Sequence, residues 1–233
     1  MKKYLFLTLF FISFFTSADN IIVNGTRFIY PESEKEITIQ ISNLADRPAI
    51  AQIWLDTGDS TVLPENITTP FQITPPISRV DAKGGQTLRI KLIDKTGIAT
   101  DRETLWWLNI LDIPPINKEA MNDGKNLLQL AIRSRFKLFY RPAGLGNRDL
   151  ATEQLTFTAK GNSLEINNAS PFYITVTAIT LSDKKQLIQK SVMLLPKNRT
   201  EIPLNKSVKR GDKLFISNIN DYGSDLTFNA TLE

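Results

Sequence analysis

Residues 36–42 read Glu-Ile-Thr-Ile-Gln-Ile-Ser, a strict alternation of isoleucine with polar side chains. Successive side chains of a β-strand point to opposite faces, so the three isoleucines would share one face and Thr38 and Gln40 the other. A strand with one apolar face covers a core on that side and meets water on the other. Because two packed antiparallel sheets bury such faces, this stretch predicts a β-sandwich.

Similar short stretches of alternating or β-branched residues recur along the rest of the chain, separated by turn residues. No segment combines a helical period with helical length, so the predicted fold class is all-β. The expected strands are 27–30, 36–42, 49–56, 87–93, 104–110, 127–140, 155–159, 163–167, 175–181, 213–218 and 225–232.

A domain boundary is predicted where the chain reads Arg141-Pro-Ala-Gly-Leu-Gly146. Proline removes a backbone hydrogen-bond donor and ends strand pairing, and the two glycines allow a sharp change of direction. Each side of this point carries its own set of strands. We therefore expect two immunoglobulin-like β-sandwich domains, at 19–142 and 143–233.

The first 18 residues have the three parts of a secretory signal peptide. Lys2 and Lys3 form the charged start, 4–15 is an almost wholly apolar run, and small residues before Asp19 allow cleavage near Ala18. A membrane anchor is the alternative, but a spanning helix needs about 20 apolar residues and this run is shorter. The mature chain is expected to be exported and soluble.

Cysteine and histidine are both absent. Their absence excludes a disulfide framework, a thiolate nucleophile, a Ser-His-Asp triad and a zinc site built from these residues. The 28 basic and 24 acidic residues are scattered rather than gathered in a stripe, so nucleic-acid binding is not expected. No cofactor or metal is predicted.

An enzyme of this composition would need paired carboxylates, as in sandwich-fold glycosidases. The candidates are in no arrangement that separates a general acid from a nucleophile, so we expect no catalytic activity. They are Asp56, Asp59, Asp101 and Glu103.

A long apolar stretch precedes the domain boundary. Residues 124–142 read Gly-Lys-Asn-Leu-Leu-Gln-Leu-Ala-Ile-Arg-Ser-Arg-Phe-Lys-Leu-Phe-Tyr-Arg-Pro, which is longer than the usual strand of about five or six residues. One face of its first half would carry Asn126, Leu128, Leu130 and Ile132. Taken by itself, this pattern favours a central strand of a sandwich.

Four segments, in order along nearly the whole chain, resemble the periplasmic chaperones of the chaperone-usher pilus pathway. They are GTRFIYP at 25–31, PFQITPPISR at 70–79, IATDRETLWWLNILDIPP at 98–115 and KLFYRP at 137–142. The resemblance implies two immunoglobulin-like domains in a boomerang arrangement, located in the periplasm. The short connection before residue 126 is similar to that of the short-loop class. The cysteine pair that many relatives carry in the second domain is missing.

The resemblance also implies a binding mode. A pilus subunit of this pathway lacks the last strand of its immunoglobulin-like domain, and the chaperone adds its own strand to the open sheet. The implied donor residues are Asn126, Leu128, Leu130 and Ile132. The implied anchor for the C-terminal carboxylate of the subunit is the pair Arg27 and Lys137. The implied interdomain charge cluster is Glu103, Arg141 and Asp221. The implied partners are pilus or fimbrial subunits and an outer-membrane usher.

A secreted immunoglobulin-like adhesin or a pilus subunit remains the alternative. A subunit should carry an N-terminal donor extension and lack a strand, whereas this chain has a long internal apolar strand and a second domain. A free apolar edge invites pairing, so we expect self-association that caps the donor strand in the absence of a subunit. Trp106 and Trp107 would lie on opposite faces of one strand and are assigned to no site.

Overall fold

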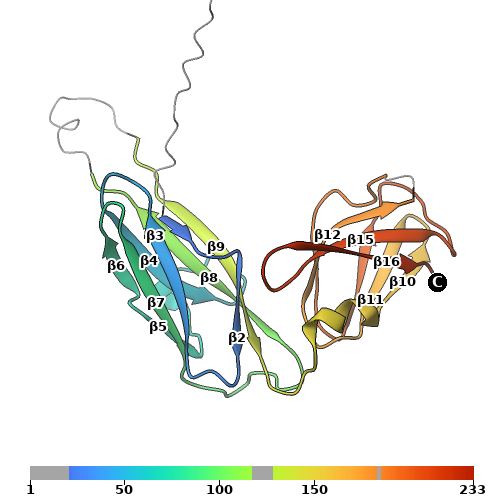
Figure 1. Cartoon of the computed structure of the whole chain (residues 1–233), viewed down its shortest axis with the longest axis horizontal. Helices are drawn as coiled ribbons and strands as arrows, with labels where there is room; N and C mark the ends of the chain where they lie inside the picture. The colour runs from blue at the N-terminus through green and yellow to red at the C-terminus, as the bar shows by residue number, and fades with distance from the viewer. Residues whose placement is uncertain (1–20, 117–127, 183–184) are drawn as a thin grey trace, which may run out of the picture.

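The computed structural model describes residues 21–116, 128–182 and 185–233. Two β-sandwiches lie side by side at an angle and give the chain a boomerang outline (Figure 1), which confirms the predicted fold class. None of the helices within the described ranges is long and apolar enough to cross a membrane.

The first sandwich packs a five-stranded sheet against a four-stranded one. The five-stranded sheet has the order β2 (Arg27–Pro31), β9 (Ile132–Arg141), β8 (Thr104–Ile113), β4 (Ala49–Asp56) and β6 (Ile77–Val80). The four-stranded sheet has the order β1 (Ile21–Val23), β3 (Ile37–Asn43), β7 (Gly85–Leu92) and β5 (Phe71–Thr74). A 3-10 helix, η1 (Pro64–Asn66), lies in the loop between β4 and β5.

The core of this sandwich lies between the inward faces of the two sheets. Ile39 and Ile41 are fully buried there, as the alternation in 36–42 predicts. Trp106 packs its ring edge-on against Phe71 at 4.9 Å between ring centroids. Its neighbour Trp107 lies on the outward face of β8, so the predicted opposite orientation of the two tryptophans is confirmed.

The second sandwich packs a three-stranded sheet against a four-stranded sheet. The first has the order β10 (Leu155–Lys160), β11 (Ser163–Asn168) and β14 (Asn198–Pro203), and the second β13 (Val192–Leu194), β12 (Ile174–Leu181), β15 (Lys213–Ile219) and β16 (Asp225–Thr231). A 3-10 helix, η2 (Arg148–Gln154), leads into β10.

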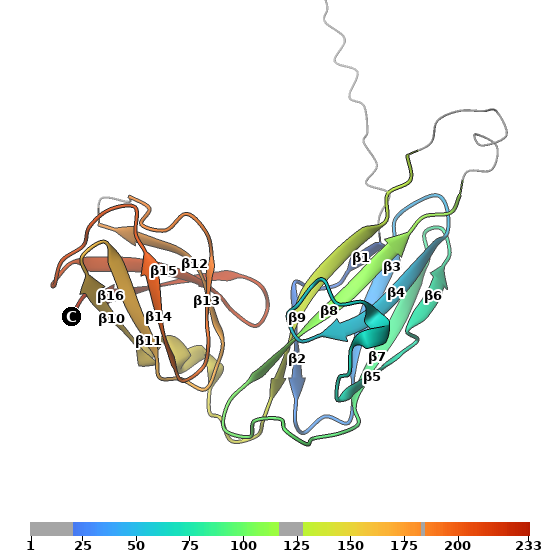
Figure 2. The same cartoon turned by 180° about the vertical axis from the view of Figure 1, so that it is seen from behind.

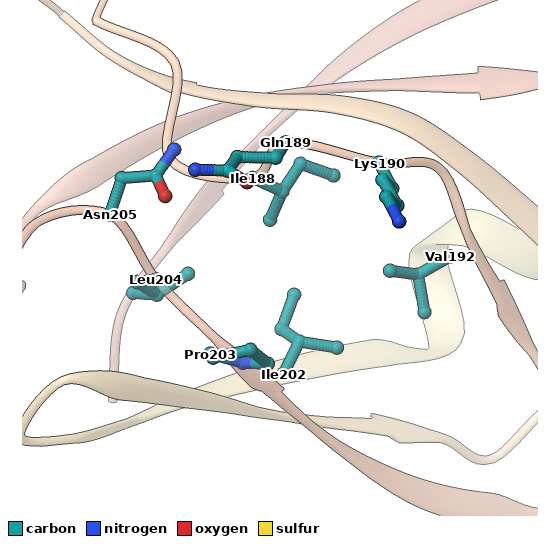
Figure 3. A pocket seen from close by; sticks show the side chains of 8 residues that line it. All are labelled: Ile188, Gln189, Lys190, Val192, Ile202, Pro203, Leu204 and Asn205. Atoms are coloured by element: carbon teal, nitrogen blue, oxygen red, sulfur yellow. The ribbon is translucent and has the colours of Figure 1, made fainter.

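Figure 3 shows an apolar pocket between the edge strands β13 and β14, lined among others by Ile188, Val192, Ile202 and Leu204.

Sequence patterns missed five strands: β1, β5, β6, β13 and β14. All five lie at or next to a sheet edge and have three to six residues, too few for a clear alternation.

The strand predicted at 127–140 also begins later than expected, at Ile132. In the antiparallel pairing Asp112 faces Ile132, and continuing that pairing would place Pro114 and Pro115 opposite residues 130 and 129, which precede β9. Prolines have no N–H to donate, so β8 cannot extend the ladder to 128–131.

Candidate functional site

One edge of β9 is open over half of its length. The other edge pairs with β8 from Ile132 to Tyr140, but β2 pairs in parallel with β9 only from Lys137 onward. Within the part of the chain that the structure describes, 132–136 therefore have no partner strand on the β2 side. This edge is open because the N-terminal segment passes from one sheet to the other between β1 and β2. β1 pairs with β3 in the opposite sheet, and Gly25, with φ of 140°, lies between β1 and β2.

Apolar side chains precede this open edge and remain in solvent. Leu128 is 85% exposed, Leu130 64% and Ile132 43%. Asn126 lies outside the described residues. The central, fully buried strand that periodicity alone favours is therefore wrong for 128–132, because none of the described elements covers that face. Farther along β9, Leu138 and Tyr140 are buried in the core.

A shallow groove runs beside the open edge, between β1 and β9. It has a volume of about 320 Å³ and is lined mainly by apolar side chains, including Ile21, Val23, Ile110, Ile132 and Phe136. An extended peptide that paired with the open edge would lie along this groove, where main-chain hydrogen bonds and side-chain burial act together.

Arg27 and Lys137 are brought together at the end of the open edge, opposite each other in the β2–β9 pairing. The Lys137 ammonium donates to the Thr175 hydroxyl at 2.9 Å, and the Arg27 guanidinium donates to the Ile219 carbonyl at 3.4 Å. Both acceptors belong to the second sandwich, on β12 and β15. Neither cation forms an ion pair with a described residue, and Nε of Arg27 is buried without a partner.

Burial makes this pair electrostatically unusual. Desolvation, and then the charge of Arg27, lowers the pKa of Lys137 to about 8. Desolvation, followed by the charge of Arg148, lowers the pKa of Arg27. Two converging, partly desolvated cations suit an anion with two oxygens, because charge-assisted hydrogen bonds to a carboxylate are stronger than neutral ones.

The predicted cluster of Glu103, Arg141 and Asp221 also comes together. Arg141 lies 2.7 Å from Oε1 of Glu103 and forms a bidentate pair with Asp221 at 2.7 and 3.0 Å. Glu103 is buried, and desolvation raises its pKa against the opposing effect of Arg141. Asp221 lies in the turn between β15 and β16, which reaches toward the first sandwich (Figure 1), so the cluster joins the two sandwiches.

Other contacts between the sandwiches surround this cluster. The second oxygen of Glu103 accepts from the Tyr173 amide at 2.9 Å, and the ring of Tyr173 lies 5.5 Å from that of Phe139. Gly223, with φ of 86°, approaches Thr26 so closely that a Cβ there would collide with the threonine hydroxyl.

Sequence reasoning missed Thr175, Tyr173 and Arg148 as parts of this region. Arg148, on η2, is buried and donates to the Tyr173 carbonyl at 3.3 Å, and burial lowers its pKa. The one available signal was the outward position of Phe139 on β9, a large apolar side chain on the face that carries Lys137. A pattern within one strand does not identify the residue that packs on it from another domain.

With this geometry established, comparison with known proteins identifies the family. Residues 20–146 match the model for the PapD N-terminal domain of pili and flagellar-assembly chaperones, and residues 150–230 match that for the PapD C-terminal domain of pili assembly chaperones. The chain belongs to the PapD family of pilus-assembly chaperones. The resemblance stated from four sequence segments is confirmed.

Individual proteins named as chaperones are similar over all or most of the chain. Chaperone protein MrkB of Klebsiella pneumoniae is 57% identical over 233 residues, which cover 100% of both chains. The crystal structure of the Pseudomonas aeruginosa CupB2 chaperone is 34% identical, with a TM-score of 0.77, over 91% of this chain and 100% of the other. A structure of the Salmonella enterica SafA pilin in complex with the SafB chaperone matches at 28% identity and a TM-score of 0.77, over 93% and 98%.

Proposed function

We propose that this PapD-family protein is a periplasmic chaperone that holds pilus or fimbrial subunits by strand addition and delivers them to an outer-membrane usher. The observation that carries the proposal is the open edge of β9, which ends at two half-buried cations without ion-pair partners among the described residues. The SafA–SafB complex supports subunit binding, since its chaperone has the same fold at 28% identity.

In this mechanism the carboxylate at the end of the subunit binds Arg27 and Lys137 and sets the register. A slip of one residue would turn every side chain of a strand to the opposite face, so a fixed point at one end is needed. The subunit strand then pairs along 132–136. The donor residues Asn126, Leu128, Leu130 and Ile132 enter the groove of the subunit. Burying each apolar one contributes about 1.5–3 kcal/mol before entropic costs.

Glu103, Arg141 and Asp221 have a structural role in the proposal. Their ion pairs hold the two sandwiches at the angle that brings Thr175 and the Ile219 carbonyl to the two cations. The proposed domain limits are 19–142 and 143–233, with 1–18, which lie outside the described residues, removed near Ala18 on export to the periplasm.

No catalytic step, cofactor, metal or nucleic acid enters this mechanism, and the PapD family is one of chaperones. Without a subunit, the exposed side chains of Leu128, Leu130 and Ile132 would favour self-association that caps them.

Co-expression with candidate pilus subunits tests the proposal. The expected result is a one-to-one complex that copurifies from periplasmic extracts, with the subunit lost when its last residues are deleted. Polymerisation of the purified chain with itself, and no stable complex with any candidate subunit, would favour the pilus-subunit alternative instead.

A further inference from the structure

A buried carboxylate on the outer face of the five-stranded sheet binds two arginines of β9. Asp56, at the end of β4, is almost completely buried. Arg135 donates to both of its oxygens, at 2.7 and 2.9 Å, and Arg133 donates to one of them at 3.3 Å. Because β8 lies between β4 and β9, these contacts cross the sheet and tie β9 to a strand that it does not pair with.

Asn109 on β8 completes this network from the strand in between. Its side-chain amide donates to Asp56 at 2.7 Å, and its side-chain oxygen accepts from both arginines, at 2.9 and 3.1 Å. Asn109 is fully buried, so each of these polar groups depends on its protein partners for hydrogen bonds.

Two tryptophans and a loop hold the guanidinium groups from the remaining sides. Arg133 lies 4.8 Å from the centroid of the Trp54 ring, and Arg135 lies 4.8 Å from that of Trp107. The loop after β4 crosses the same face (Figure 2), where the carbonyl of Ser60 accepts from Arg133 and that of Gly58 from Arg135. We call Asp56, Asn109, Arg133 and Arg135 the outer clamp.

We propose that the outer clamp is a positioning device that holds β9 in the sheet and register of the chaperone while a subunit strand pairs with its open edge. This inference rests on the proposed function. Over 132–136, β8 is the only strand within the described ranges that forms backbone hydrogen bonds with β9. A bound subunit strand would add a second ladder on the other edge, and β9 would then belong to two sheets. When the subunit leaves, the strand has to separate at one of these two edges.

The outer clamp strengthens the β8 edge of β9, which has to stay paired when the subunit leaves. Its contacts lie on the outward face of β9, opposite the donor residues, so they leave the donor side chains free. The fork of an arginine is suited to this role because its donors have fixed directions and bind carboxylate and amide oxygens together. The clamp thus adds side-chain contacts to a ladder that one-sided backbone pairing would leave weaker.

The test uses peptides of two lengths to distinguish binding at the open edge of β9 from binding at the carboxylate anchor. Arg133→Gln is the variant of choice, because Arg135 shares the Trp107 ring with Lys137, which lies 5.9 Å from its centroid. Arg79→Gln is the matched control, since Arg79 is an exposed arginine on β6, the opposite edge strand of the same sheet. The probes are the tripeptide Val-Thr-Val, which reaches the anchor only, and a nonapeptide of alternating valine and threonine, which also spans the open edge. Both have a free C-terminal carboxylate.

The wild-type protein and Arg79→Gln should bind the nonapeptide more tightly than the tripeptide. Arg133→Gln should bind the tripeptide normally but lose about tenfold in nonapeptide affinity, with faster amide hydrogen exchange confined to β9. Arg133→Lys, which keeps the positive charge but loses the planar fork, should recover part of the loss.

Equal nonapeptide affinity and equal exchange in Arg133→Gln and the wild type would overturn the outer clamp alone. A wild-type protein that bound the two peptides equally would overturn the proposed strand addition itself. A loss of affinity for both peptides, with exchange faster throughout the first sandwich, would reduce the clamp to a general contribution to stability and also overturn the inference.

Discussion

Arg27 and Lys137 lie directly opposite each other across the parallel pairing of β2 with β9, and each donates a hydrogen bond to the second sandwich. Like charges held side by side in a partly dry site raise the free energy of the charged forms. A bound carboxylate would recover that free energy. The proposed anchor is therefore shared between the domains, because its charges come from the first sandwich and the neutral acceptors of these cations from the second.

Removal of either cation should prevent recovery of a chaperone–subunit complex while the protein stays folded. Lys137→Ala and Arg27→Ala each remove a charge-assisted hydrogen bond worth about 1.5–3 kcal/mol, or roughly ten- to hundredfold in affinity. Copurification with a subunit and the thermal unfolding midpoint are the measurements. Lys91→Ala, an exposed lysine on β7, is the control. A full yield of complex from the Lys137 and Arg27 variants would contradict their role.

The pH dependence of carboxylate binding should follow the Lys137 ammonium. Its pKa of about 8 lies below the ordinary value of 10.5, so the charge needed for binding is lost as pH rises through 8. Affinity for a peptide with a free C-terminal carboxylate should then fall toward tenfold per pH unit above that point. Titration calorimetry from neutral pH to about 9.5 measures it, and the C-terminally amidated peptide, which lacks the anion, should show no such fall.

The same lowered pKa determines whether the free energy of unfolding rises or falls with pH. Between pH 8 and 10.5 the unfolded chain binds more protons at Lys137 than the folded one does. The free energy of unfolding should therefore rise with pH in this window. Urea titrations at several pH values give the free energy of unfolding, which should rise more steeply with pH in the wild type than in Lys137→Met. Parallel pH profiles of the two proteins would exclude a lowered pKa at this position.

Two leucines of the same segment should behave in opposite ways. Leu138→Ala removes a fully buried side chain from the core and should cost about 2–5 kcal/mol of stability. Leu128→Ala alters a side chain in solvent, so its stability should stay within about 0.5 kcal/mol of the wild type. Its complex with a subunit should nevertheless weaken by about 1.5–3 kcal/mol. Denaturant unfolding and subunit affinity, measured on both variants, check the contrast.

Interdomain ion pairs should differ in strength according to burial. Arg141→Ala leaves the buried Glu103 carboxylate without its cation, and breaking a buried pair costs about 3–5 kcal/mol. Asp221 is more exposed, so Asp221→Asn should cost no more than about 1 kcal/mol. Chemical denaturation gives both values, and equal effects of the two substitutions would show that burial does not set the strength of this cluster.

Interior strands could be predicted because one covered face imposes alternation on the sequence. Residues 36–42 and 49–56 lie in such strands, and the structure places β3 and β4 there within one residue. The five missed strands are edge strands of three to six residues, too short for an alternation to show, and β14 also begins with the polar run Asn-Arg-Thr-Glu. Alternation reports that a face is apolar but does not report what covers it.

That limit explains the outcome at the site. Leu128 and Leu138 have the same parity, yet one is in solvent and the other in the core, because the burial of each is set by strands far away in the sequence. The resemblance supplied the pairing of Arg27 with Lys137. Thr175 contacts β9 from the other domain, and Asp56 contacts it from β4, a strand that does not pair with β9. No local sequence pattern therefore pointed to either residue.

Pro114 and Pro115, which stop β8 from extending, also prevent residues 128–131 from pairing with β8 in the same chain. If those positions could donate backbone hydrogen bonds, residues 128–131 would close onto β8 as an ordinary hairpin. The free protein would then already hold, in its own hairpin, the segment that is proposed to pair with a subunit. A missing N–H group on the β9 side of β8 thus leaves the chain incomplete at the place where it is proposed to complete another protein.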